Sequence, residues 1–270
     1  MSARRGCLVR LSTHLARRLE ESESARGRVH SVFARAVNVQ WSDGSLLALH
    51  GPGPLLAPFA AAVDDVARLG ALRPDMIVTV ESGRLLAPGL GLSWQGAQRV
   101  DCALVSRRPG GASGFAALAG VLPPHAPGLD SQLGRDARAA LAAGIAERDA
   151  TRLMAGARSL LGLGEGLTPA GDDCLVGALA VLHAVDASVL TEPGVAAAIA
   201  ADAGARTTTI AREFVLHALA GRFSEPVLAV LRARSRDEAD RAAARLATSG
   251  ATSGADTLHG MRLAWDALAV

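Results

Sequence analysis

The sequence contains no lysine and no tyrosine. All 28 basic residues are therefore arginine, and they stand against 26 acidic residues for a net charge of +2. Without lysine the chain cannot form a lysine Schiff base, a Walker-type phosphate site or the lysine base of a Ser/Lys hydrolase. Arginine is the only strong cation that it offers to a phosphate or a carboxylate. The nearly balanced charge argues against a nucleic-acid surface, so no nucleic-acid partner is expected.

Cysteines and long apolar runs are also scarce. The three cysteines, Cys7, Cys102 and Cys174, lie far apart and show neither metal-site spacing nor a disulfide framework. The first residues lack an apolar stretch of signal-peptide length, and no apolar run approaches the ~18 residues that a membrane span needs. We therefore expect a cytoplasmic protein that has no membrane partner.

The residue pattern divides the chain into two parts and predicts an α+β fold. Residues 1–106 contain short alternating runs separated by turn dipeptides, which indicate a mainly antiparallel β-rich domain. Residues 107–130 are rich in glycine and proline and are expected to form a linker. Residues 131–270 show helical periodicity and are predicted to form a helical domain that carries the glycine-rich loops.

Within the first domain, helices are expected at residues 11–23 and 55–69, and one strand is expected at residues 29–40. The expected hairpin turns are Asp43-Gly44, Ser82-Gly83 and Gln95-Gly96. In the second domain, the pattern predicts helices at residues 131–147, 149–161, 169–185, 195–201, 207–220, 225–234, 236–247 and 255–269.

The most informative stretch is residues 161–177, Leu-Gly-Leu-Gly-Glu-Gly-Leu-Thr-Pro-Ala-Gly-Asp-Asp-Cys-Leu-Val-Gly. Thr168 is expected to cap a helix that begins with Pro169, and Asp172 and Asp173 fall in its first turn. Closely spaced glycines allow positive φ and let a ligand approach the backbone. A capped helix with an acidic first turn is the alternative, although capping does not explain so many glycines.

A second copy of this pattern precedes the last predicted helix. Residues 252–260, Thr-Ser-Gly-Ala-Asp-Thr-Leu-His-Gly, can be laid against residues 168–177 with one gap, so that Asp256 aligns with Asp173. In each copy the aspartate precedes a glycine by four residues, which places both on one helix face. We infer that two helix N-termini face one ligand across a small shared cavity; chance similarity is the alternative.

The carboxylates restrict the ligand. A phosphate about 5 Å from one carboxylate is repelled by roughly 3 kcal/mol at an effective dielectric near 20, whereas a helix N-terminus returns only about 0.3–1 kcal/mol. Ionised Asp172 and Asp173 therefore favour a bridging Mg²⁺ or a ligand that donates N–H groups, such as a carbamoyl or amide group. Arg206, beside Thr207 and Thr208 at another helix start, is a candidate for the missing cation; ordinary capping beside a solvated arginine is the alternative.

The candidate catalytic residues, which are also the candidate Mg²⁺ ligands, are Asp172 and Asp173. The candidate ligand-binding residues are Gly162, Gly164, Gly166, Thr168, Gly171, Arg206, Thr207, Thr208, Thr252, Ser253, Gly254 and Asp256.

The string Gly-x-Gly-x-Gly-Leu-Thr-Pro-x-Gly-Asp-Asp at residues 162–173 resembles a bacterial family whose better-known member is the AllH subunit of oxamate carbamoyltransferase. The resemblance runs from about Val29 to the C-terminus. It includes the weaker motifs at residues 27–31, 221–225 and 252–260. Ala170 stands where this family often has serine, and Ala251 stands where a polar residue, often histidine, is expected.

This resemblance implies that a carbamoyl group moves between oxalurate and phosphate in anaerobic allantoin breakdown, giving oxamate and carbamoyl phosphate. It also implies partner subunits, because AllH works with two unlike chains. The Ser-Thr-Arg-Thr phosphate loop of aspartate and ornithine carbamoyltransferases is absent, so a different fold is expected.

Three functions remain open. The first is a subunit of a carbamoyltransferase-type enzyme with a small-ligand site at the glycine-rich loop. The second is a Mg²⁺-dependent enzyme that binds a nucleotide or phosphate at the same loop. The third is a non-catalytic assembly subunit of a hetero-oligomer, in which the loop is an interface.

Overall fold

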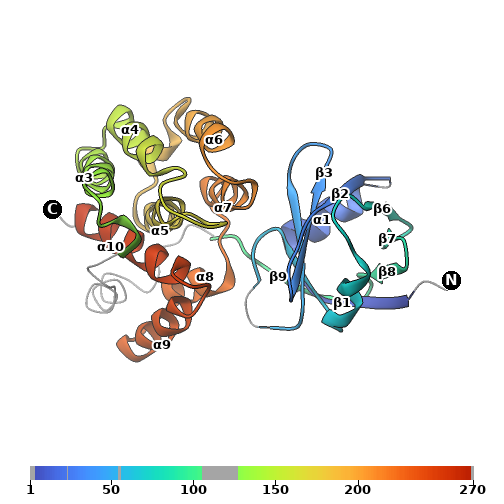
Figure 1. Cartoon of the computed structure of the whole chain (residues 1–270). Helices are drawn as coiled ribbons and strands as arrows, with labels where there is room; N and C mark the ends of the chain where they lie inside the picture. The colour runs from blue at the N-terminus through green and yellow to red at the C-terminus, as the bar shows by residue number, and fades with distance from the viewer. Residues whose placement is uncertain (1–3, 23, 54–55, 105–126, 269–270) are drawn as a thin grey trace. The chain divides into compact units, whose positions relative to one another are not determined.

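The computed structural model describes residues 4–22, 24–53, 56–104 and 127–268, which fall into two compact units, Met1–Cys102 and Ala103–Val270 (Figure 1). The first unit is rich in strands and the second is helical, so the predicted α+β fold is confirmed. Most of the predicted linker lies outside the described residues. None of the helices in the described ranges is both long and apolar enough to cross a membrane.

The N-terminal unit is a nine-stranded sheet with strand order β5-β4-β3-β2-β6-β7-β8-β1-β9. An additional pairing between β5 and β1 closes the sheet on itself. Alternate side chains of the strands fill its interior, as Val37 and Val39 do. The elements are β1 (Arg4–Ser12), α1 (Thr13–Glu21), β2 (Arg26–Val32), β3 (Ala36–Trp41), β4 (Leu46–His50), β5 (Ala60–Val63), the 3₁₀ helix η1 (Val66–Ala71), β6 (Ile77–Glu81), β7 (Arg84–Ala87), β8 (Leu90–Ser93) and β9 (Gln98–Val100).

Most neighbouring strands are antiparallel, as predicted, but three pairings are parallel. These are β1 with β8, β1 with β9, and β4 with β5. The hairpin turns at Asp43-Gly44 and Ser82-Gly83 are confirmed, because β3 pairs with β4 and β6 pairs with β7. The hairpin predicted at Gln95-Gly96 is wrong, since β8 and β9 each pair with β1.

The helix expected at 11–23 is confirmed as α1, although it begins at Thr13, because Ser12 ends β1 and its Oγ accepts a hydrogen bond from Leu15 N at 3.0 Å. Two further predictions in this unit are wrong. The strand expected at 29–40 is two strands, β2 and β3, which pair across a turn. The helix expected at 55–69 contains the buried strand β5, since a short apolar run does not distinguish a strand from a helix.

The C-terminal unit surrounds one buried helix, α5. Fourteen of its 16 residues are buried, and it packs against α4, α7, α8 and α10. A helix that is apolar on all sides is expected at the centre of a helical domain. The elements are the 3₁₀ helix η2 (Pro127–Leu129), α3 (Gln132–Ala146), α4 (Ala150–Leu160), α5 (Ala170–Val185), the 3₁₀ helix η3 (Ser188–Thr191), α6 (Val195–Arg206), α7 (Thr209–Leu219), α8 (Glu225–Arg232), α9 (Arg236–Ala247) and α10 (Ser253–Leu268).

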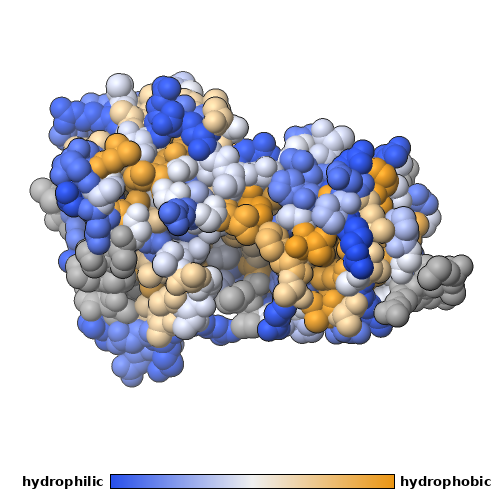
Figure 2. Space-filling view, viewed as in Figure 1, coloured by the Kyte–Doolittle hydropathy of each residue, from blue (hydrophilic) through white to orange (hydrophobic). Residues whose placement is uncertain are grey.

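These bounds agree closely with the helices predicted from the sequence, except that α6 continues to Arg206. Ser235 caps α9, because its Oγ accepts from Glu238 N at 3.3 Å, and Glu238 Oε2 accepts from Arg234 N at 2.7 Å. The exposed side of α9 forms a hydrophilic surface in Figure 2.

The backbones of α5 and α10 touch at two glycines. A Cβ atom on Gly177 would lie 1.9 Å from Thr257 O, and one on Gly260 would lie 1.9 Å from Cys174 O. Gly177 aligns with Gly260 in the sequence repeat, and Cys174 aligns with Thr257, so the two contacts are equivalent by exchange of the copies. The sequence repeat therefore corresponds to a reciprocal contact between the two helices.

The same equivalence holds for a second pair of glycines, six residues before the crossing glycines in α5 and α10. A Cβ atom on Gly171 would lie 2.0 Å from Leu160 O, and one on Gly254 would lie 1.8 Å from Leu246 O. Leu160 ends α4 and Leu246 lies near the end of α9. The pair α4–α5 and the pair α9–α10 are thus two copies of one helix–loop–helix arrangement.

Replacing either crossing glycine with alanine is expected to destabilise the protein. We expect Gly177→Ala and Gly260→Ala each to lower the free energy of unfolding by about 1–3 kcal/mol or more, because the added methyl group overlaps a carbonyl oxygen. Gly204→Ala in α6 is the matched control, since its Cβ would meet nothing within 4 Å. That control should be neutral or stabilising by up to about 1 kcal/mol. Urea denaturation measures all three, and equal stability of the three variants would contradict the proposed contact.

Candidate functional site

Three helix starts meet at the glycine-rich loop before α5. The buried carboxylate of Asp172 accepts hydrogen bonds at Oδ2 from Gly162 N at 3.1 Å and from Thr207 Oγ1 at 2.7 Å. Gly162 opens the loop and Thr207 precedes α7. Asp172 therefore ties the first turn of α5 both to its own loop and to the start of α7.

The other end of the loop is bound to α7 and α10. Thr208 Oγ1 donates to Leu167 O at 2.5 Å, and its hydroxyl also caps α7 by accepting from Ala211 N at 3.1 Å. Thr168 Oγ1 and Ser253 Oγ lie 2.7 Å apart and share a hydrogen bond. The prediction that Thr168 caps α5 is wrong, because its hydroxyl is used by α10; the helix begins after Pro169 without a side-chain cap.

The loop glycines adopt the left-handed conformations that the sequence predicts. The φ angles of Gly162, Gly164 and Gly166 are 75°, 119° and 90°. A Cβ atom on Gly162 would also lie 2.1 Å from Arg206 O. The chain can therefore pass between α4 and the start of α7 only because this residue has no side chain.

Three aspartates come together where the loop meets α5 and α10. The exposed fractions of Asp172, Asp173 and Asp256 are 1%, 8% and 0%. The buried oxygens Oδ1 of Asp172, Oδ2 of Asp173 and both of Asp256 have no hydrogen-bond partner among the described residues. Leaving a buried acceptor unpaired costs about 1–3 kcal/mol, so this carboxyl cluster is prepared to accept hydrogen bonds from a ligand.

Burial also changes the protonation of these groups. It raises the pKa of Asp173 to about 8, with the nearby Asp256 and Asp172 carboxylates raising it further, although the Ser253 and Thr168 hydroxyls oppose this. Burial raises the pKa of Asp172 to about 6 against the hydrogen bonds from Thr207 and Gly162. The pKa of Asp256 is also raised by burial, and the neighbouring Thr252 hydroxyl opposes this rise. At pH 7 Asp173 is mainly protonated, whereas the sequence argument assumed that Asp172 and Asp173 are both ionised.

Arg206 and Gly254, two of the remaining candidate residues, make contacts with other helices. Arg206 Nε donates to Arg158 O at 3.1 Å on the exposed side of α4, so the guanidinium is engaged away from the carboxyl cluster. Gly254 contacts the end of α9 through its backbone. The ligand-binding roles assigned to these residues stay predictions.

The 3₁₀ helix η2 packs against the carboxyl cluster. A Cβ atom on Gly128 would lie 2.6 Å from Ala170 Cβ and 3.6 Å from Asp256 Oδ1. Asp172, Asp173 and Asp256 line neither the hollow beside Arg138 and His259 nor the hollow beside Trp94 and Arg99. The two helix starts meet as expected, and the shared cavity between them stays a prediction. Ala170, one of the departures from the family pattern, lies directly beneath Gly128.

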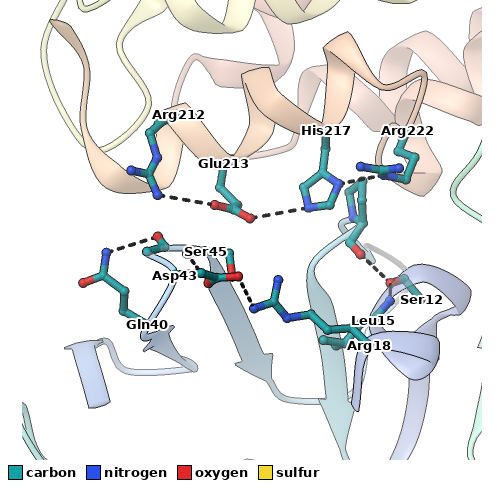
Figure 3. A network of polar contacts seen from close by, with 12 residues as sticks. Ser12, Leu15, Arg18, Gln40, Asp43, Ser45, Arg212, Glu213, His217 and Arg222 are labelled. Carbon is teal, nitrogen blue, oxygen red and sulfur yellow. Dashed lines mark hydrogen bonds and ion pairs between the residues drawn. The ribbon is translucent and has the colours of Figure 1, made fainter. Parts of the chain in front are cut away.

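A second polar array, formed by Glu213 and His217 of α7 together with Arg222, was not found by sequence reasoning (Figure 3). Arg222 Nε donates to His217 Nδ1 at 3.0 Å, so the proton of neutral His217 is on Nε2, 3.6 Å from Glu213 Oε1. The sequence pattern that indicates this array is the spacing of four residues between Glu213 and His217, which places both side chains on one helix face.

Arg138 on α3 was also missed. Its Nη1 donates to Nε2 of His259 at 2.9 Å, and its Nη2 donates to Leu129 O at 3.3 Å. No sequence pattern distinguishes Arg138 from other arginines, because an arginine on a predicted helix is typical of a solvated face.

Comparison with family sequence models identifies both units. The model described as "Oxamate carbamoyltransferase subunit AllH" matches residues 160–265, and the model described as "AllH family N-terminal domain" matches residues 5–99. The chain belongs to the AllH family. The first match contains the glycine-rich loop, the carboxyl cluster and both crossing glycines of this AllH-family protein. Searches of curated proteins and of solved structures found no match.

Protonation of Asp173 should make the stability of this AllH-family protein depend on pH. The folded protein holds the proton more tightly than the unfolded chain, whose pKa is near 3.8. The stabilisation is thus complete below about pH 4 and is lost as the pH rises through about 8. We expect Asp173→Asn, which mimics the neutral carboxyl group, to reduce this loss of stability with rising pH. Each unit of difference between the folded and unfolded pKa corresponds to about 1.4 kcal/mol of stability.

Urea denaturation at pH 5, 6.5 and 8 measures this effect. Asp237→Asn on the exposed face of α9 is the control and should keep the wild-type decline. An unchanged decline between pH 6.5 and 8 in Asp173→Asn would contradict the assignment.

Proposed function

We propose that this chain is a carbamoyltransferase subunit that binds the carbamoyl or amide group of a small substrate at the carboxyl cluster. The observation that carries the proposal is the set of buried carboxyl oxygens of Asp172, Asp173 and Asp256 that accept no hydrogen bond from any described residue. The family description names an oxamate carbamoyltransferase subunit, which supports this reaction class. Oxalurate, oxamate and carbamoyl phosphate are the substrates that we propose, within the breakdown of allantoin.

A carbamoyl NH₂ group fits the cluster because it offers two N–H donors. Ionised Asp172 and the carboxyl group of Asp256 would accept these hydrogen bonds from opposite helix starts. Asp173 is mainly protonated at pH 7, and its one proton is available to the leaving nitrogen. The loop amides would donate to the carbonyl oxygen, where negative charge develops during acyl transfer.

Asp173 also has the protonation state of a general acid. When phosphate attacks the carbamoyl carbon of oxalurate, a C–O bond forms and the C–N bond to the oxamate nitrogen breaks. The leaving nitrogen needs one proton, and the attacking hydrogen phosphate loses one. Asp173 would give its proton to the nitrogen and regain one from the phosphate, which leaves the enzyme unchanged.

Binding of the phosphate requires hydrogen-bond donors from outside the carboxyl cluster. Neutral Asp173 removes one of the two repulsive charges that the sequence argument counted, but Arg206 is engaged with Arg158 O. We propose that the Ser253 hydroxyl, the loop amides and the partner subunits of a hetero-oligomer complete the anion site, because the hydroxyl protons of Thr207 and Thr208 are donated to Asp172 and to Leu167 O.

A Mg²⁺-dependent phosphate or nucleotide site at Asp172 and Asp173 is the second candidate. Unpartnered oxygens on adjacent residues favour it, since Mg²⁺ takes one or two carboxylates together with phosphate oxygens. In the described ranges no group of three or more acidic, histidine or cysteine side chains is arranged to hold a metal ion.

Ligand-induced changes in melting temperature test these alternatives. The full chain, alone and with its partner subunits, is heated with oxamate or carbamoyl phosphate, with and without Mg²⁺. A ligand at about 100 times its Kd should stabilise the protein by about 2.7 kcal/mol. We expect Asp256→Asn to abolish the ligand-induced shift and Asp237→Asn to preserve it.

The outcomes separate the three functions. A shift that requires Mg²⁺ supports the second candidate. No shift in the complete complex contradicts carbamoyl binding. Loss of complex formation in Gly162→Ala with no ligand effect in any variant supports an assembly subunit.

A further inference from the structure

A second candidate site lies between α3 and α10, along the part of α10 that follows Asp256. It is an open groove with a volume of about 490 Å³. Its apolar wall consists of small alanines from α3 together with Leu263 and Ala267 of α10. The polar residues along it are Arg138, His259, Arg262 and Asp266.

The charge of Arg138 is not balanced within this groove. The guanidinium donates to three neutral acceptors, which are Gly134 O at 3.3 Å, Leu129 O at 3.3 Å and His259 Nε2 at 2.9 Å. Within the described ranges, no carboxylate forms an ion pair with Arg138. An arginine side chain stays charged at all accessible pH values, so this half-buried cation is a site for an anion.

Arg262, the other arginine that lines the groove, forms an ion pair. Arg262 Nε lies 2.6 Å from Asp266 Oδ2 on the same helix, and this ion pair compensates its charge. An anion in the groove therefore gains most from Arg138. The hydrogen bonds to Leu129, Gly134 and His259 fix the orientation of the guanidinium before any ligand binds.

We propose that this groove binds a small organic acid whose carboxylate or phosphate group pairs with Arg138 and whose short apolar part lies on the alanines and Leu263. A bare inorganic ion would leave most of the 490 Å³ unfilled. Arg138 lies outside both segments that match the family models, whereas His259, Arg262 and Leu263 lie within residues 160–265. It does not depend on the function proposed for the carboxyl cluster.

NMR titration of the full chain tests the proposal with butanoate, butyl phosphate and butanamide. Butanamide has the shape of butanoate but no charge. We expect saturable shifts of α3 and α10 amide signals with one or both anions, and at least tenfold weaker binding of butanamide. The two anions distinguish a carboxylate from a phosphate ligand.

Two variants separate the role of Arg138 from a general effect of charge. Arg138→Gln should weaken anion binding at least tenfold. Arg135→Gln, on the exposed face of the same helix, should leave it within about twofold. Because Arg138 also holds η2, Ala139→Glu provides an independent test; this exposed groove residue can carry a negative charge without disturbing those hydrogen bonds, and binding should again fall at least tenfold.

The proposal is overturned if neither anion produces saturable shifts at low ionic strength. It is equally overturned if butanamide binds as tightly as butanoate, or if Arg135→Gln weakens binding as much as Arg138→Gln. In those cases the groove is an apolar surface for another occupant, such as a side chain of a partner subunit.

Discussion

The close backbone contact between α5 and α10 is the constraint on which the helical unit depends. Packed helices usually lie about 8–10 Å apart because side chains separate them. Gly177 and Gly260 remove those side chains at two equivalent points, so the carbonyl oxygen of each helix fills the gap in the other. Any side chain at either position would push the helices apart and separate their N-terminal ends.

The carboxyl cluster is a consequence of this contact. Asp173 and Asp256 lie one turn before the crossing glycines on their own helices, so bringing the glycines together brings the carboxyl groups together as well. The hydrogen bond between Thr168 and Ser253 then fixes the two helix starts at 2.7 Å. The cluster is held mainly by packing, because several of its oxygens have no hydrogen bond among the described residues.

Burial decides what this cluster can do chemically. Two exposed aspartates at a helix start would be ionised and would repel phosphate, but here the loss of water raises the pKa of Asp173 to about 8. A neutral carboxyl group can donate a hydrogen bond, whereas the neighbouring ionised Asp172 can only accept one. One cluster therefore combines a donor and acceptors, and this combination is the basis of the proposed carbamoyl site. The groove between α3 and α10 has the opposite character, since an oriented arginine makes it a donor of hydrogen bonds to anions.

The sequence by itself determined most of the local structure. The dipeptides Asp43-Gly44 and Ser82-Gly83 define their hairpins because few residues adopt the required φ angles, and the helix bounds follow from periodicity and caps. The repeat of Asp-x-Leu-x-Gly also identified both helices of the central pair. In these cases the deciding interactions lie within a few residues, so they can be deduced from the order of residues alone.

Only the tertiary structure decided which strands pair with β1, how the hydroxyl of Thr168 is used, and how Arg138 is oriented. Each depends on partners far away in the chain: β1 pairs with β5, β8 and β9, Thr168 bonds to Ser253, and Arg138 bonds to His259. Protonation of Asp173 belongs to the same class, because desolvation depends on everything that packs around the carboxyl group. Local sequence rules describe neither long-range pairing nor the exclusion of water, and these two effects made the site.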